Sequence, residues 1–165
     1  MTNPRLQTAM DEVKSTYKEV IAIGNEMIAH YTGQADSEIK FLLENIDSLS
    51  NEMIRNSLLK ISLVSYSFSE VKEKSALKAD IAETLRKEKY ANEFLLAEGS
   101  VATKDNTATI ATSGEIVTDL LFSYVSSALK TKLDEQHRVV DTLKSVLISR
   151  QSEAKLLSVT ESENE

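Results

Sequence analysis

The sequence predicts an all-α protein: a long antiparallel helical hairpin, a coiled coil, with an additional N-terminal helical segment and an oligomeric assembly. Proline (1 residue), glycine (4) and aromatic residues (5%) are scarce among the 165 residues, and turn-rich β folds do not tolerate such a composition. Residues 51 to about 157 contain no proline, and Gly99 and Gly114 are their only glycines. Apolar residues recur there every three or four positions, as on one face of a helix.

Residues 1–50 are expected to form a separate helical segment. Its first helix is predicted from Pro4 to Tyr31, and Gly33 is expected to end it, as glycines often end helices. The apolar stripe of this helix has alternating spacings of four and three, at Leu6, Met10, Val13, Tyr17, Val20, Met27 and Tyr31. Gly24 fills a vacant slot of that stripe, which indicates either close helix packing or local weakness. A short second helix is then expected, with apolar residues at Ile39, Leu42, Leu43 and Ile46.

Residues 51–157 are expected to form the hairpin, with a break at residues 98–100. Gly99 is suited to the backbone conformation that ends a helix, and Ser100 is suited to cap the next one. The two predicted helices are Asn51–Glu98 and Val101–Leu157. The second half of the first helix is rich in charge. Its remaining large apolar residues form a sparse seam rather than a globular core, at Leu77, Ile81, Leu85, Phe94 and Leu95.

Two heptad rows predict the packed face of the second long helix. One row is Leu133, Val140, Leu147 and Ala154, and the other is Leu129, Gln136, Leu143, Arg150 and Leu157. Gln136 and Arg150 interrupt the second row, as polar residues that set register or partner number do. The acidic tail, residues 158–165, is expected to be disordered.

The sequence carries no pattern of a catalytic or metal site. His30 falls near the end of the first helix, and His137 lies among charged neighbours without a second cluster to complete a metal site. There is no glycine-rich phosphate loop and no nucleophile elbow. Cysteine is absent, which favours an intracellular location, and no apolar run reaches the roughly 20 residues of a membrane span. We therefore expect a cytoplasmic protein that is not an enzyme and has no cofactor, metal or membrane partner.

Six cationic residues fall within eighteen positions of the first long helix: Lys72, Lys74, Lys78, Arg86, Lys87 and Lys89. A helix face bearing such residues can follow a phosphate backbone, and the ring of the neighbouring Tyr90 could stack on an unpaired base. These six residues are the candidate nucleic-acid site. The alternative is a surface laced with salt bridges, because acidic residues alternate with them at Glu70, Glu73, Asp80, Glu83 and Glu88.

Three parts of the hairpin carry a family resemblance. The first is the run Ala76-Leu77-Lys78-Ala79-Asp80, and the second is the break Ala97-Glu98-Gly99-Ser100-Val101-Ala102-Thr103-Lys104. The third comprises Asp119-Leu120-Leu121, Ser127-Ala128-Leu129 and His137-Arg138, and closes at Arg150-Gln151-Ser152-Glu153. In these features residues 74–156, roughly half of the chain, resemble the small phage recombination mediators of the UvsY type, which load a recombinase onto single-stranded DNA.

The resemblance implies an α-helical protomer that assembles into a ring or barrel and binds single-stranded DNA. It also implies contacts with a recombinase and a single-strand-binding protein, and a host-cell cytoplasm if the chain is phage-encoded. Lys78 matches the family position that contacts DNA, and Lys74 lies close by. Asp80 departs from the pattern, because a second basic residue is expected there.

Three functions are open at this point. The first is an oligomeric recombination mediator, in which avidity offsets a weak cationic face on each protomer. The second is a scaffolding coiled-coil protein, such as a phage assembly chaperone, without nucleic-acid binding. The third is an inhibitory DNA mimic, suggested by the acidic ends and the net charge of −7. A mimic needs its acids on one face, whereas here they alternate with lysines.

Overall fold

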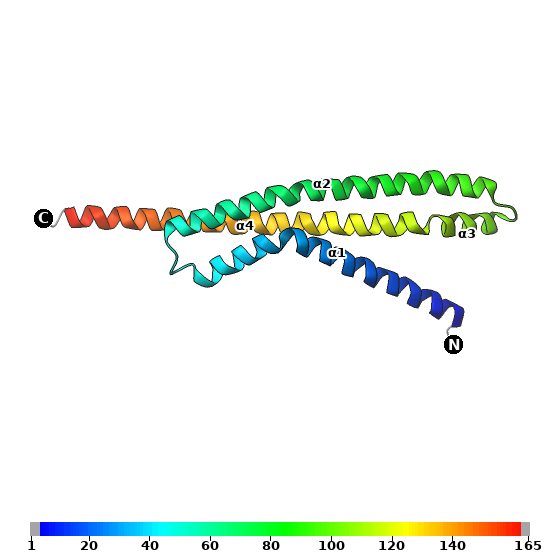
Figure 1. Ribbon diagram of the computed structural model, residues 1–165, viewed down its shortest axis with the longest axis horizontal. Coiled ribbons are helices and arrows are strands. Elements are labelled where there is room, and N and C mark those ends of the chain that lie inside the picture. The colour runs from blue at the N-terminus through cyan, green and yellow to red at the C-terminus, as the bar shows by residue number, and fades with distance from the viewer. Residues whose placement is uncertain (1–3, 163–165) are drawn as a thin grey trace. The chain divides into compact units, whose positions relative to one another are not determined.

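The computed structural model describes the backbone of residues 4–162 and the side chains of residues 15–156. The described residues form four helices and no strand, which confirms the all-α class (Figure 1). The helices are α1 (Pro4–Asn45), α2 (Asn51–Leu96), α3 (Val101–Ala111) and α4 (Ser113–Ser162). They contribute to two compact units, each of which is described by itself. Unit 1 is Met1–His30 with Glu70–Leu129, and unit 2 is Tyr31–Ser69 with Lys130–Glu165.

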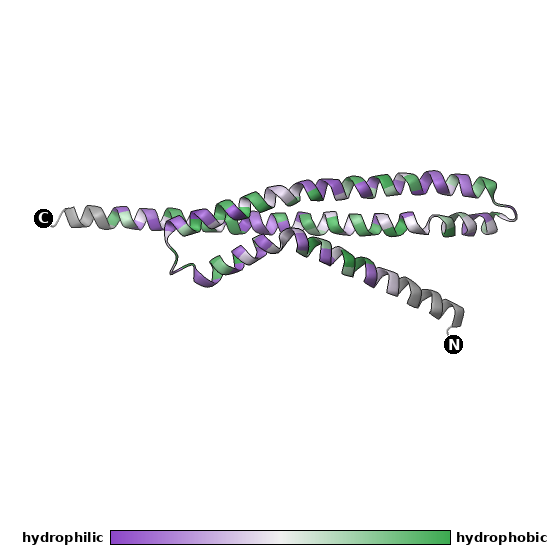
Figure 2. Cartoon of the chain, viewed as in Figure 1, coloured by the Kyte–Doolittle hydropathy of each residue, from purple (hydrophilic) through white to green (hydrophobic). Residues whose placement is uncertain are grey.

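Unit 2 is held by a cluster of large aliphatic side chains to which α1, α2 and α4 all contribute. Burying such side chains stabilises a fold by roughly 1.5–3 kcal/mol each. The heptad rows predicted for the second long helix supply the α4 side of this cluster, so α2 and α4 pack together as expected. Hydrophobic and hydrophilic residues alternate along both helices (Figure 2). The cluster is Leu42, Leu49, Ile54, Leu58, Ile61, Val140, Leu143 and Leu147.

Two polar residues in the second heptad row make defined contacts in unit 2. The Arg150 guanidinium donates from Nη1 to the carbonyl of Leu49 at 2.8 Å and from Nη2 to that of Ile46 at 2.6 Å. These carbonyls lie just beyond the end of α1, where no further helical turn supplies donors. Gln136 is buried, and its Oε1 accepts from the Ser65 hydroxyl at 2.5 Å. Both interruptions of the row therefore join α4 to a neighbouring segment.

Unit 1 is packed differently, because α2 turns small residues inward. Ser75, Ala79 and Ala82 are its buried residues in this unit, whereas Leu77 and Ile81 are exposed. The prediction that the large residues form the seam with the second long helix is therefore wrong for this part of α2. Positions two apart on a helix lie on nearly opposite sides. Leu77 is two positions from both Ser75 and Ala79, so burial of these small residues leaves Leu77 on the exposed side of α2.

The N-terminal segment forms one helix rather than the predicted two. α1 runs through Gly33 without interruption to Asn45. A buried stripe continues across the glycine, with Thr32 and Ala35 almost fully buried on either side of it. A mid-helix glycine costs roughly 1 kcal/mol, which the burial of this stripe offsets. The prediction that Gly33 ends the helix is therefore wrong.

The turn between α2 and α3 follows the predicted signals. Gly99 has a φ of +110°, a conformation that side chains with a Cβ rarely adopt. Ser100 is the N-cap of α3, where its hydroxyl accepts from the Thr103 amide at 3.3 Å. The Ser50 hydroxyl caps α2 in the same way, accepting from the Met53 amide at 3.2 Å.

The second predicted long helix is divided at Thr112 into α3 and α4. The buried Thr112 hydroxyl lies 3.0 Å from the carbonyl oxygen of Ala108 and 3.1 Å from that of Thr109. Such back-bonding by threonine competes with regular helix geometry. α4 then continues to Ser162, beyond the predicted end at residue 157. Residues 158–162 are therefore helical rather than disordered as expected. Residues 163–165 lie outside the described residues, so the disorder expected of them stays a prediction.

Candidate nucleic-acid interface

The six candidate cations all lie on α2 within unit 1. At about 100° per residue, Lys74, Lys78 and Lys89 fall within roughly 60° of one another around the helix. Lys72, Arg86 and Lys87 fall on other sides. The structure therefore brings three of the candidates to one side of α2 and does not gather the other three with them.

Two of the candidates form exposed ion pairs within α2. Lys74 Nζ lies 2.6 Å from Glu70 Oε1, and Lys87 Nζ lies 2.7 Å from Glu83 Oε1. The hydrogen bond from each lysine lowers the pKa of its partner carboxyl below the usual value. Exposed pairs of this kind contribute little to stability because water screens them, so another anion can replace the glutamate at little cost.

Lys72 and Arg86 lie away from this side of the helix. Lys72 Nζ is 2.6 Å from Glu73 Oε1, and its side chain is mostly covered. Arg86 is half-buried, and its charge adds a small further lowering to the pKa of Glu83. Neither residue presents its charge on the same side of α2 as the exposed Lys78. Lys72 and Arg86, both predicted to contact nucleic acid, are therefore poorly placed to bind the same strand as Lys78.

Lys78 and Lys89 link α2 to α4 instead of projecting freely. Lys78 Nζ lies over the ring of Phe122, 4.7 Å from its centroid, a geometry favoured by cation–π attraction. Lys89 Nζ lies 2.9 Å and 3.2 Å from the two carboxylate oxygens of Glu115. That hydrogen bond is the main reason why the pKa of Glu115 is lowered.

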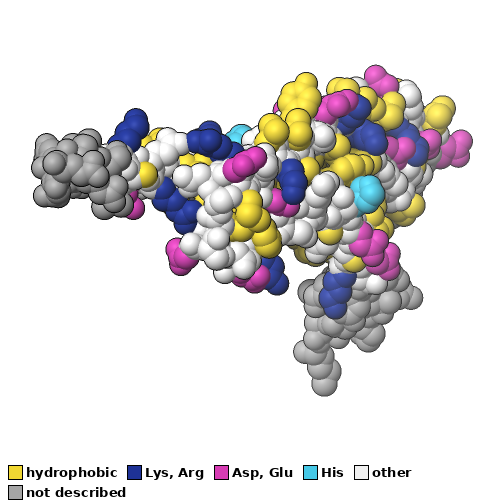
Figure 3. Space-filling view, turned by 60° about the vertical axis from the view of Figure 1, so that its left-hand side comes forward, with side chains coloured by type: hydrophobic (Ala, Val, Ile, Leu, Met, Phe, Trp, Pro, Cys, Tyr) yellow, Lys and Arg dark blue, Asp and Glu magenta, His cyan; other side chains and the backbone are white. Residues whose placement is uncertain are grey.

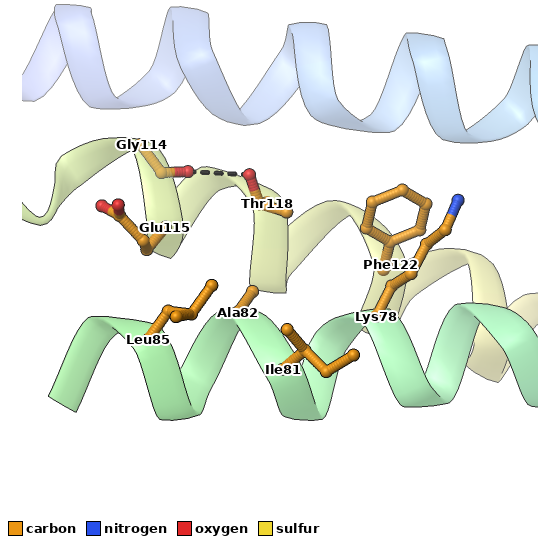
Figure 4. Close-up of a pocket in the computed structure, with 8 residues that line it drawn as sticks. All are labelled: Lys78, Ile81, Ala82, Leu85, Gly114, Glu115, Thr118 and Phe122. Atoms are coloured by element: carbon orange, nitrogen blue, oxygen red, sulfur yellow. Dashed lines mark hydrogen bonds between the residues drawn. The ribbon is translucent and has the colours of Figure 1, made fainter. Parts of the chain in front are cut away.

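A shallow groove of about 360 Å³ runs between these two contacts. Figure 4 shows the aliphatic residues of α2 on one side of it, with the Lys78 side chain beside the Phe122 ring at one end. Phe122 was not singled out from the sequence, because nothing near residue 122 indicates that α4 brings its ring to Lys78. The groove is lined by Lys78, Ile81, Ala82, Leu85, Gly114, Glu115, Thr118 and Phe122.

Tyr90, the predicted stacking residue, is engaged within unit 1. Its hydroxyl donates a hydrogen bond to Asp105, and this bond raises the pKa of Tyr90. Its ring stacks on that of Phe94, with centroids 6.1 Å apart and an interplanar angle of 21°. One face of the Tyr90 ring is therefore already covered by Phe94.

The surface around the candidate site is mixed in charge. Figure 3 shows lysine and arginine side chains next to aspartate and glutamate over the face in view, without a separate basic patch. Within the described residues, no group of three histidine or acidic side chains is placed to hold a metal ion. None of the described helices combines the length and apolar character needed to cross a membrane. Comparison with protein families, curated proteins and solved structures finds no match to this chain.

Proposed function

We propose that this chain is a recombination mediator that binds single-stranded DNA as a homo-oligomer and helps to load a recombinase. It acts without catalysing a reaction, in the cytoplasm, and in the host's cytoplasm if it is phage-encoded. A recombinase and a single-strand-binding protein are its proposed protein partners. The resemblance of residues 74–156 to UvsY-type mediators motivates this role.

The contact of Lys78 with Phe122 carries the proposal. A nucleotide presents an anionic phosphate and a flat base, which a cation next to an aromatic ring can recognise together. The groove beside this contact has apolar walls from Ile81 and Leu85. A base can enter this groove while its phosphate reaches Lys78, and Lys74 lies one helical turn away for the next phosphate.

Pairing of the lysines with glutamates weakens the site without abolishing it. The Lys74–Glu70 pair is about two-thirds exposed on both sides, so breaking it costs little. A bound phosphate then replaces the carboxylate. Each protomer binds weakly as a result, and an assembly of several protomers gains its affinity by avidity.

Binding of fluorescent oligothymidylate, titrated with salt, tests the proposal. Lys78→Ala is expected to weaken binding several-fold and to reduce the salt slope by about 0.7 for each phosphate that the protein no longer neutralises. Phe122→Leu is expected to weaken binding by about 1 kcal/mol or more per stacked base. Lys40→Ala is the matched control, because Lys40 is exposed and pairs with Glu44 of its own helix at 3.9 Å. Absence of binding by the assembled protein at low salt contradicts the proposal.

A scaffolding coiled-coil protein without nucleic-acid binding is the second candidate. It is favoured by one observation: four of the six cations, Lys72, Lys74, Lys87 and Lys89, pair with carboxylates. Native mass measurement with and without an oligonucleotide separates the two functions. A scaffold keeps the same mass in both samples, whereas a mediator gains the mass of bound DNA.

A further inference from the structure

In unit 1, α2 exposes its large apolar residues. Leu77, Ile81 and Leu85 are 59%, 49% and 51% exposed. They are spaced four apart and therefore form one ridge along the helix. The inward side of the same helix is made of small residues. A helix that turns its large apolar side chains outward loses the stabilisation that their burial provides, so this ridge is suited to being covered by another surface.

A second shallow hollow, of about 270 Å³, flanks the ridge on the side away from Phe122. It is bounded by Ile81 and Leu85 of the ridge and by Asp80, Thr84 and Glu88 beside them. Helices pack when the ridge of one enters the groove of the other. The surface carries both a ridge and a hollow, and a two-fold contact between identical copies requires both on the same patch.

We propose that this ridge is the contact surface for a second copy of the chain, with the two α2 helices antiparallel about a two-fold axis at Ile81. Ile81 then meets Ile81 of the second copy. Leu77 of the second copy enters the hollow beside Leu85, and the symmetric contact forms at the other end. The inference rests on the proposed function, which requires the chain to oligomerise. It adds the surface through which two copies of the chain bind each other.

Charge selects the antiparallel direction. In this register Lys74 of one copy lies level with Glu88 of the other, and the symmetry repeats the pair. Parallel helices would set Lys74 against Lys74 and Glu88 against Glu88, and like charges opposite one another are destabilising. The positive end of the ridge at Lys74 therefore meets the negative end at Glu88 of the second copy only when the two helices are antiparallel.

The contact leaves Lys78 and Phe122 uncovered, whereas it engages Lys74 and the outward sides of Ile81 and Leu85, which also line the groove. Within the pair, Lys78 is therefore the cation that remains for a phosphate. A two-fold axis perpendicular to paired helices keeps the same side of each helix on the same side of the pair. Both Lys78 residues consequently lie on one side, where one strand can reach both. Three apolar side chains per copy cover less than the roughly 1,200 Å² at which specific, stable interfaces begin, so the pairing is expected to depend on concentration.

Disulfide trapping tests this register, because the chain contains no cysteine. Under mild oxidation Ile81→Cys is expected to give covalent dimers. A mixture of Leu77→Cys and Leu85→Cys chains is expected to cross-link more than either variant alone, whereas parallel helices would cross-link each variant to itself. Ile110→Cys is the control, because Ile110 is exposed in the same unit and belongs to α3 rather than to α2. Equal cross-linking of Ile110→Cys and Ile81→Cys overturns the proposal.

Charge reversal provides an independent measurement. Lys74→Glu and Glu88→Lys are each expected to weaken self-association about tenfold by sedimentation equilibrium, because two ion pairs become like-charge contacts. The double variant is expected to restore association. If neither single variant changes association, the register is wrong.

Ile81→Glu separates this inference from the proposed function. It is expected to shift the mass toward that of one 18.3 kDa chain, and Ile110→Glu is expected to leave the mass unchanged. An Ile81-dependent dimer that binds no oligonucleotide would refute the proposed function and keep the interface. An unchanged mass of Ile81→Glu overturns the interface whatever happens to oligonucleotide binding, because Ile81 also lines the groove proposed for a base.

Discussion

At the residue scale, Gln136 is a buried amide whose hydrogen bonds are incomplete. The Ser65 hydroxyl lies within reach of both Gln136 Oε1 and the Ile61 carbonyl, yet it has one proton to donate. Among the described residues Gln136 Nε2 has no partner. Reversing the amide lets Nε2 donate to Ser65 while Ser65 donates to Ile61. One polar atom of the amide stays unsatisfied in either orientation.

We therefore expect Gln136→Leu to raise the free energy of unfolding by about 1 kcal/mol, since an unsatisfied buried polar group costs about 1–3 kcal/mol. Denaturant unfolding of the variant measures this change. Ser65→Ala is the companion variant, and a small destabilisation is expected from removal of its hydrogen bond. A buried polar residue can also fix partner number, so native mass measurement on Gln136→Leu checks for a mixture of assemblies. A destabilised Gln136→Leu would show that the amide is fully satisfied.

Glu38 gives unit 2 a defined pH dependence. The Ser57 hydroxyl donates to its carboxylate, and Lys60 Nζ lies 3.4 Å away. The Ser57 hydrogen bond is the main cause of the lowered pKa of Glu38, and Lys60 adds to it. A carboxyl with a lowered folded-state pKa stabilises the fold above its unfolded pKa of about 4.3. That contribution is lost as the pH falls through the folded value.

The expected result is that Glu38→Gln is less stable than the natural chain at pH 7. The difference is expected to shrink once the pH falls below the unfolded pKa of about 4.3 and to disappear after the pH has fallen through the lowered folded-state pKa. Thermal unfolding measured from pH 3 to pH 7 follows the difference. Glu44→Gln serves as the control, because the Lys40–Glu44 pair is exposed on both sides. A difference between Glu38→Gln and the natural chain that is the same at every pH would argue against the ionised contact.

At the element scale, α1 contains two glycines with opposite roles. A Cβ placed on Gly24 would lie 2.5 Å from Tyr124 Cδ1, whereas a Cβ on Gly33 would meet nothing within 4 Å. The Tyr124 ring is held in place, because its hydroxyl donates to Asn25 Oδ1 at 2.6 Å. The sequence allowed two interpretations of Gly24, close helix packing or local weakness, and the structure supports close helix packing.

These glycines form a matched pair for substitution by alanine. Gly33→Ala is expected to stabilise the chain by about 0.5–1 kcal/mol, because glycine weakens a helix interior by that amount. Gly24→Ala is expected to destabilise it by about 1–2 kcal/mol, because overpacking outweighs the gain in helix propensity. Denaturant unfolding of both variants measures the contrast. Equal effects of the two substitutions would contradict the tight contact with Tyr124.

At the scale of the whole molecule, the two units differ in what α2 buries. In unit 2 it buries Ile54, Leu58, Ile61 and Phe68, and in unit 1 it buries Ser75, Ala79 and Ala82. Large apolar side chains contribute more stability on burial than small ones. Local opening therefore costs more free energy in the first half of α2 than in the second.

Hydrogen exchange measures this difference along a single helix. Amides of residues 54–68 are expected to exchange at least about tenfold more slowly than those of residues 75–90, given the larger burial energies. Exchange should be measured at low protein concentration, where a second copy of the chain does not cover the ridge. Uniform protection along α2 would contradict a weaker second half.

The candidate site shows why the sequence located some of its residues and not others. Composition and charge runs identified the stretch from Lys72 to Lys89 as cationic, and the structure places all six candidates on α2. Spacing also predicts that Lys74 and Lys78 share a side of the helix. Phe122 could not be identified from the sequence, because its contact with Lys78 joins residues 44 positions apart.

The sequence by itself determined the helical class, the turn around Gly99 and the face of α4 that packs in unit 2. These follow from local rules, since backbone conformation, capping and heptad spacing are properties of neighbouring residues. Only the tertiary structure decided that α1 continues through Gly33 and that the small side of α2 packs in unit 1. Both outcomes depend on burial against other helices. A helix with apolar residues on two opposite sides gives no local indication of which side is buried.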